Sequence, residues 1–155
     1  MASVIEDFRK RCEFLQTMTL DFANDMPDEH WGFSPHPRFA PFCKQLRHVV
    51  CVRGVYNDAL ISKRADFSNK HGHYSGGLTR DELAAALVDQ HDALLAIVDT
   101  LDTDVPIEVF GRPFGFVDFT YTMVQHEALH HGEWSVYASL AGFETPLSWR
   151  LEWGL

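Results

Sequence analysis

Apolar residues recur at steps of three and four over four long stretches of this chain, which is the pattern of amphipathic helices. The first stretch covers residues 4–24, with Ser3 and Glu6 as an S-x-x-E capping box at its start. Its apolar stripe consists of Ile5, Phe8, Cys12, Leu15, Met18 and Phe22. This spacing predicts a helix with one buried face.

The next two stretches also begin at recognisable helix starts. The second helix is predicted over residues 42–63, because Pro41 suits a first helical turn. The third opens with another capping box, Thr79 and Glu82, and is predicted to run to about residue 101. Its expected buried positions are Leu83, Leu87, Ala93 or Leu94, and Val98.

The fourth helix is predicted over residues 116–141, with Gly142 as its stop. Proline, glycine and aromatic residues mark the connections between helices as loops, and one of them contains a weakly signalled extended pair, Ile107 to Phe110 and the segment around Phe114. Residues 143–155 are expected to be a tail. The pattern predicts an all-α fold, an antiparallel four-helix bundle, as a single domain spanning residues 1–155.

Composition narrows the class of protein. The chain has 155 residues, 46% of them hydrophobic, and a formal net charge of −9, which disfavours binding to a nucleic-acid backbone. No stretch has the roughly 20 apolar residues of a membrane span, and the N-terminal residues lack a signal pattern. The three cysteines form no C-x-x-C motif, so we expect a reducing compartment and a cytoplasmic location.

The pair His126 and His130 is the most informative chemical feature. Residues four apart on a helix lie on the same face, so these two imidazoles can hold one metal ion. His48, on the second predicted helix, is the best third ligand, because a bundle brings side chains of different helices together. Three imidazoles leave a metal position open, as in catalytic sites.

Glu133 shares the face of His126 and His130, three residues past the latter. It is a candidate for a fourth ligand, for a group that orients an imidazole N–H, or for a catalytic base, and a surface carboxylate is the competing interpretation. Glu127 is adjacent to His126 and is expected to point off this face into solvent. His131 is one step, about 100°, from His130 and is expected at the rim or surface.

The other candidates have simpler interpretations. His71 and His73 lie in a glycine-rich loop and are expected to be exposed, and Cys51 is expected to be a small apolar core residue rather than a ligand. The remaining histidines are expected to be structural or exposed, and the aromatic and methionine side chains near the pair are expected in the core: His30, His36, His91, Met123, Trp134 and Tyr137.

Two segments carry a family resemblance. Leu46-Arg47-His48, and His126 to Gly132 followed by Leu140-Ala141-Gly142, resemble the DinB/YfiT-like family of metalloenzymes over nearly the whole chain. The chain departs from that family at His131, where arginine is frequent, and at Glu133, where glutamine is frequent. The resemblance implies a four-helix bundle in an up-down-down-up order and a divalent metal, zinc, nickel or iron, on three histidines. Some members of that family use low-molecular-weight thiols and many form dimers, so the resemblance also implies a thiol cofactor and a homodimer for this chain.

These observations lead to competing functions. The first is a metal-dependent enzyme, a hydrolase or a low-molecular-weight thiol transferase acting on a small-molecule substrate. The alternative is a non-enzymatic metal-binding stress-response protein, and a third is a bundle whose histidines hold no physiological metal. A homodimer is also expected, from the family tendency and from an apolar tail with Trp149, Leu151 and Trp153 that is available to cover a helix face.

Overall fold

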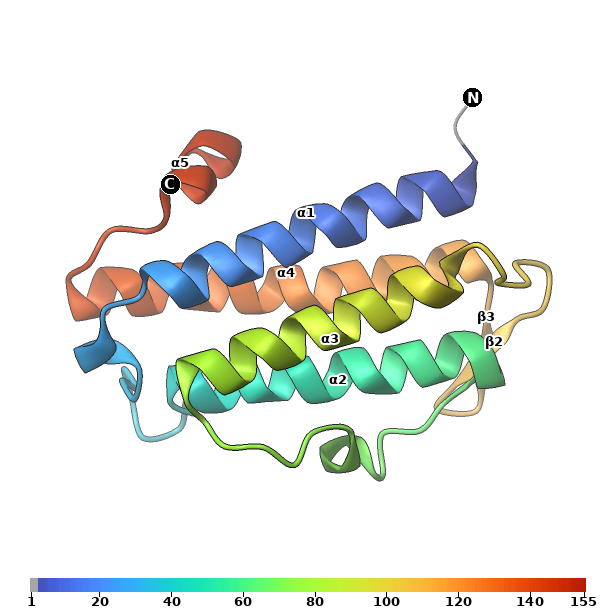
Figure 1. Cartoon of the computed structure of the whole chain (residues 1–155), viewed down its shortest axis with the longest axis horizontal. Helices are drawn as coiled ribbons and strands as arrows, with labels where there is room; N and C mark the ends of the chain where they lie inside the picture. Colours follow the sequence, from blue (N-terminus) through green and yellow to red (C-terminus); the bar gives the residue numbers. More distant parts are fainter. Residues whose placement is uncertain (1–2) are drawn as a thin grey trace.

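The structure, a computed structural model, describes residues 3–155 and is mostly helical, as predicted (Figure 1). Four long helices form the body of the molecule, and two 3-10 turns, three short strands and a C-terminal helix complete the described chain. The α-helices are α1 (Val4–Asp25), α2 (Phe42–Ser62), α3 (Arg80–Val98), α4 (Phe116–Ala141) and α5 (Leu147–Trp153). Within the described residues, no helix is long and apolar enough to cross a membrane.

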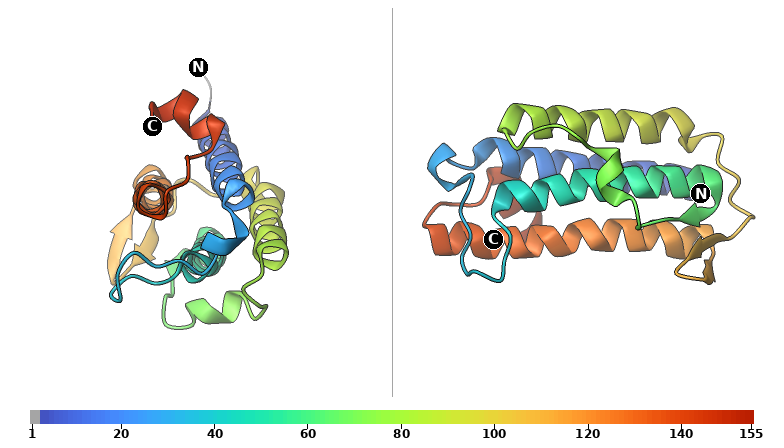
Figure 2. Two further views of the ribbon diagram at one scale, coloured as in Figure 1. Left: turned by 90° about the vertical axis from the view of Figure 1, so that its left-hand side faces the viewer. Right: turned by 90° about the horizontal axis from the view of Figure 1, so that it is seen from below.

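The four long helices lie side by side, with α1 and α4 running in one direction and α2 and α3 in the other (Figures 1 and 2). Contacts join α1 to α3 and α4, and α2 to α3 and α4. The predicted antiparallel arrangement therefore describes the pairs α1–α3 and α2–α4, whereas α2–α3 and α1–α4 run parallel. The connection after α2 makes this order possible, because it travels back along the bundle through the 3-10 turn η2 (Lys70–His73).

Local signals in the sequence account for the helix boundaries. The Ser3 hydroxyl accepts the backbone N–H of Glu6 at 3.1 Å, and Thr79 forms a complete capping box with Glu82. Gly142 ends α4 at φ 82°, a left-handed conformation that favours glycine. The third helix ends at Val98, earlier than predicted, because Thr100 closes a turn with its N–H and hydroxyl on the Ile97 carbonyl.

A small sheet covers one end of the helices. The weakly signalled extended pair is confirmed as the hairpin of β2 (Ile107–Val109) and β3 (Arg112–Phe114). Its two-residue turn needs positive φ at both positions, which Phe110 (50°) and Gly111 (75°) adopt. A third strand, β1 (Arg64–Ala65), pairs parallel with β2 and was not predicted, since two residues give no alternation to recognise.

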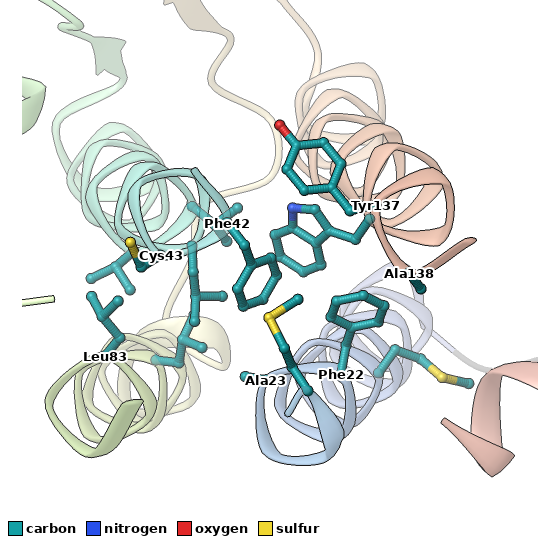
Figure 3. Packing of buried hydrophobic residues seen from close by; sticks show 14 of the residues in the cluster. Phe22, Ala23, Phe42, Cys43, Leu83, Tyr137 and Ala138 are labelled. Atoms are coloured by element: carbon teal, nitrogen blue, oxygen red, sulfur yellow. The ribbon is translucent and has the colours of Figure 1, made fainter. Parts of the chain in front are cut away.

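The core consists of two apolar clusters at opposite ends of the helices. One contains Phe22, Phe42 and Trp134, and Figure 3 shows it packed between the four long helices. The other lies toward the sheet and contains Phe8, Leu60 and other side chains of all four helices. His48, His126 and His130 belong to neither cluster. On α4, His126 and His130 lie between Phe119 of the second cluster and Trp134 of the first.

The predicted tail contains the seven-residue helix α5, which packs on the outside of the bundle (Figure 1). Trp149 is fully buried, and its indole N–H donates to the Met18 carbonyl of α1 at 2.9 Å. Trp149 therefore caps the chain's own bundle, which removes it as a motive for dimerisation. Leu151 remains 75% exposed.

Candidate metal centre

His48 of α2 and His126 and His130 of α4 converge, as the sequence predicted. One ring nitrogen of each lies within 4.8 Å of the others, and all three side chains are half-buried. Among residues 3–155 this is the group of histidine, cysteine or carboxylate side chains that could hold a metal ion. Neighbouring antiparallel helices thus bring together residues 78 positions apart in the sequence.

The spacing of the nitrogens suits a metal. His48 Nε2 and His126 Nε2 lie 3.2 Å apart. Two imidazole nitrogens on one tetrahedral ion, at about 2.0–2.1 Å each, are separated by about 3.3 Å. The same distance is a hydrogen bond when one ring carries its proton on Nε2, so the pair is compatible with a metal-bound and a metal-free state.

Aromatic neighbours hold two of the rings in place. The Tyr56 ring of α2 packs edge-on against His126, with centroids 5.9 Å apart, and the Trp134 indole stacks beside His130 at 6.2 Å. Trp134 is itself fixed, since it is fully buried and its N–H donates to Gln45 Oε1 at 2.8 Å. Trp134 and Tyr137 are core residues, as predicted, while Met123 is partly buried against the cluster near the sheet.

Burial keeps the rings of His48 and His126 unprotonated near neutral pH. Burial is the largest cause and, together with the neighbouring His130, lowers the pKa of both His48 and His126 to about 4. Lys70 acts on both rings in the same direction, and His71 acts on His48. Neutral imidazoles are the form in which histidine binds metals, so the donor set fits a divalent cation.

Glu133 lies beside the centre, and its Oε2 is 3.1 Å from His130 Nδ1. A carboxylate there accepts the Nδ1–H of His130 and leaves Nε2 free for a metal, an arrangement common around metal-bound histidines. Glu133 is not part of the group of three converging side chains. Of its predicted roles, the geometry favours orientation of an imidazole.

Glu127 was expected to face solvent, and this prediction is wrong. Its side chain is 6% exposed and pairs with Arg53 of α2, whose Nε donates to Oε2 at 2.9 Å, and with the Thr19 hydroxyl of α1. Burial alone would raise the pKa of Glu127, but the Arg53 guanidinium and these hydrogen bonds hold it below its usual value. The reason for the error is that the buried face of α4 lies next to the histidine face, about 100° away.

His131 was expected at the rim or surface, and this prediction is also wrong. The ring is 2% exposed and lies among Trp134, Trp149 and Trp153, with centroids 5.0–5.4 Å away. Its Nε2 is 2.7 Å from Thr19 Oγ1. The aromatic tail provides this burial, which the helical pattern of α4 alone did not reveal. Burial lowers the pKa of His131 to about 4.

The remaining candidates lie outside the group of three. Cys51 is buried, as predicted for a core residue, and His71 is exposed. His73 is instead partly buried, because η2 docks on α2 where Gly54 has no side chain, and a Cβ there would lie 2.6 Å from the His73 ring. His30 is partly buried and stacks on Phe143, with centroids 5.5 Å apart.

The buried polar network around the centre was not predicted, although the sequence carried one signal for it. Arg53 stands among apolar neighbours on α2, in the run Val49-Val50-Cys51-Val52-Arg53-Gly54-Val55. A charge in such a run needs a buried partner. Arg53 finds Glu127, and it also donates to Gln16 Oε1 of α1 and to the Leu87 carbonyl of α3.

Comparisons with known proteins agree with this geometry. A sequence model of the DinB superfamily matches residues 11–134, which include all three histidines. The fold is similar to that of a DinB-like protein (YjoA) from Bacillus subtilis, with a TM-score of 0.69 over 90% of this chain and 94% of that chain. The two sequences are 16% identical, so this likeness shows the fold alone. No curated protein matches the chain.

Proposed function

The chain belongs to the DinB superfamily, and from this membership and its three converging histidines we propose a metal-dependent enzyme that acts on a small molecule. The observation that carries the proposal is the group of His48, His126 and His130, in which one ring nitrogen of each lies within 4.8 Å of the others and the pKa of both His48 and His126 is lowered. Three protein ligands are the donor number of catalytic zinc sites, whereas structural sites generally have four.

Each histidine has a defined part in holding the ion, which we propose to be zinc, nickel or iron. His48 and His126 contribute their facing Nε2 atoms, and His130 contributes Nε2 while Glu133 holds its Nδ1–H. A divalent ion on three neutral imidazoles supplies a Lewis acid that acidifies a water or a thiol. The reaction is then a hydrolysis or the transfer of a low-molecular-weight thiol.

Glu133 is the group that handles protons in this proposal. Its side chain is 35% exposed, so the carboxylate that orients His130 is also accessible from solvent. A carboxylate within reach of an acidified group can accept its proton. Glu133 then has two roles, orienting His130 and accepting a proton. The variants Glu133→Ala and Glu133→Gln distinguish them.

The charge around His48 favours an anionic substrate. Lys70 and His71, from the turn η2, are close enough to His48 to lower the pKa of its ring. Arg47, the neighbour of His48 on α2, donates to the Tyr74 carbonyl at 3.4 Å and helps hold the segment after η2. The positive charge of Lys70 on this side of the centre attracts negatively charged molecules, although the whole chain has a net charge of −9.

The test compares protein stripped of metal with protein reloaded with zinc, nickel or iron. Each form is assayed against small esters, amides and anhydrides, and against electrophiles in the presence of low-molecular-weight thiols. We expect turnover in one reloaded form, and none in the His126→Ala, His130→Ala double variant. Full metal binding without turnover on any of these substrates would favour the alternative, a non-enzymatic metal-binding stress-response protein.

We also propose a homodimer. The evidence for it is the exposed surface of α4 and not the C-terminal tail. The outer face of α4 exposes Val117, Tyr121, Leu129, Val136 and Leu140, each at least half exposed. This exposed apolar stripe gives two copies of the chain a surface on which they can pack. Its edge lies beside the histidine face of the same helix.

A further inference from the structure

A groove between α1 and α4 lies on the side of α4 away from the three histidines. Phe14 and Leu15 of α1 and Val124 of α4 form apolar walls, and Trp153 and Leu155 close the end next to α5. The groove has a volume of about 630 Å³, within the range of about 300–1,000 Å³ typical of small-molecule sites. It shares no residue with the proposed metal centre.

His131 lines this groove and has an unsatisfied nitrogen. The Thr19 hydroxyl donates its proton to Glu127, so its oxygen accepts the Nε2–H of His131 at 2.7 Å. His131 Nδ1 is therefore a bare acceptor. It is buried and has no hydrogen-bond partner within residues 3–155. Buried acceptors in folded proteins nearly always have a donor, so this atom points to a partner outside the described chain.

The opposite end of the groove is basic. Lys10 and Arg11 of α1 line it together with Asp7, and Lys10 also lies 3.4 Å from Glu6. No ion pair of the described residues involves Arg11. Arg11 precedes Thr19 by eight residues on the same helix, which corresponds to a rise of about 12 Å. A ligand spanning the groove meets a cationic side chain at one end and an acceptor at the other.

We propose that this groove binds an aromatic carboxylate that carries a hydroxyl group at the end opposite its carboxylate. The carboxylate pairs with Arg11, and the hydroxyl donates to His131 Nδ1. The ring packs against Phe14 and Trp153, which already contact each other with centroids 6.0 Å apart. Trp153 lies 5.4 Å from the His131 ring and is 37% exposed, so its indole moves aside as the hydroxyl enters.

The test titrates the metal-free 155-residue chain by calorimetry with two acids that differ in one group, 3-(4-hydroxyphenyl)propionate and 3-phenylpropionate. We expect the hydroxylated acid to bind at least about ten-fold more tightly, since a hydrogen bond to a buried acceptor adds about that factor. Arg11→Gln weakens both acids by a similar factor. Arg38→Gln, an exposed arginine away from the groove, is the matched control and leaves both affinities unchanged.

His131→Phe removes the acceptor and is expected to abolish the difference between the two acids. Since that variant also loses the contact with Thr19, the nitrogen NMR signal of His131 Nδ1 in the wild type provides a second measurement. It shifts toward the hydrogen-bonded value with the hydroxylated acid alone. Equal affinities for the two acids, or an unchanged Nδ1 signal at saturation, would overturn the proposal. An affinity that falls as chain concentration rises would also overturn it, because a second copy would then occupy the groove.

Discussion

Glu133 Oε2 lies 3.1 Å from His130 Nδ1, one helical turn away on α4. With the carboxylate as acceptor, this contact places the proton of His130 on Nδ1 and leaves Nε2 unprotonated, as metal binding through Nε2 requires. Replacing such a partner generally weakens metal binding by about 10–100-fold. The sequence left three roles open for Glu133: metal ligand, orienting group or base. Because Glu133 contacts His130, its role is best tested by the effect of Glu133 variants on metal binding.

We predict that Glu133→Ala weakens metal binding by at least about ten-fold, while Glu133→Gln, which keeps an oxygen acceptor, weakens it less. A competition titration with a coloured chelator measures both, and Glu152→Gln, an exposed change in α5, is the control. Identical metal affinity of Glu133→Ala and wild type would remove Glu133 from the centre. If Glu133→Gln binds metal normally but loses turnover, Glu133 is the group that accepts the proton in the reaction.

The buried pair of Arg53 and Glu127 gives a prediction about stability. Arg53→Met leaves a carboxylate buried without its cation, which costs about 3–5 kcal/mol in similar cases. The double change Arg53→Met, Glu127→Leu is expected to be more stable than Arg53→Met, since it leaves no unpaired charge. Urea unfolding of both variants measures the difference.

The control for that pair is Arg9, whose partner Asp99 has a side chain that is 74% exposed. Arg9→Ala is expected to destabilise the fold far less than Arg53→Met, because exposed ion pairs contribute little to stability. An Arg53→Met variant as stable as Arg9→Ala would show that the buried pair does not stabilise the fold.

The histidines predict that the metal-free protein loses stability in acid. His48, His126 and His131 have a pKa of about 4 in the folded chain, against 6.5 for an ordinary histidine. Between these values the unfolded chain binds more protons than the folded chain, so stability is full above about pH 6.5 and falls as the pH drops toward 4. His131 alone contributes about 3 kcal/mol to this loss at pH 4.

Urea unfolding of the metal-free chain from pH 7.5 to 4.5 measures this loss, and His131→Phe is expected to give a shallower dependence on pH. Constant stability across that range in the wild type would contradict the burial of these rings as neutral groups.

The homodimer prediction concerns the exposed stripe of α4. Leu129→Glu with Val136→Glu places charges on that stripe and is expected to convert a dimer to single chains in sedimentation experiments. Ile61→Glu is the matched control, because Ile61 is 62% exposed on α2, outside the stripe. A wild-type chain that sediments as a monomer at micromolar concentration would contradict the prediction.

Much of the fold and the three histidines could be predicted because their signals are local. The capping residues Thr79 and Glu82, and the stop at Gly142, set helix boundaries through contacts a few residues apart. The pair His126 and His130 requires only helical geometry, and His48 required only that α2 and α4 be neighbours. The parallel pairing of α2 and α3 depends on the path of a long connection, which local patterns do not encode. Only the family resemblance, with its up-down-down-up order, implied it.

Glu127 and His131 could not be placed from α4 alone, because each is buried by contacts from other helices. Arg53 and Thr19 make the position of Glu127 acceptable for a charge, and Trp149 and Trp153 cover His131. A polar residue on a helix is normally predicted to be exposed. Partners that are distant in the sequence can bury it, and then the prediction is wrong.

Metal content of chain purified without a histidine tag tests the central claim most directly. We predict about one divalent ion per wild-type chain by elemental analysis after dialysis, and a near-complete loss in the His126→Ala, His130→Ala double variant. His71→Ala, an exposed histidine outside the group of three, keeps full occupancy. Full metal content in the double variant, or a wild type that takes up no zinc, nickel or iron when reloaded, would contradict the account.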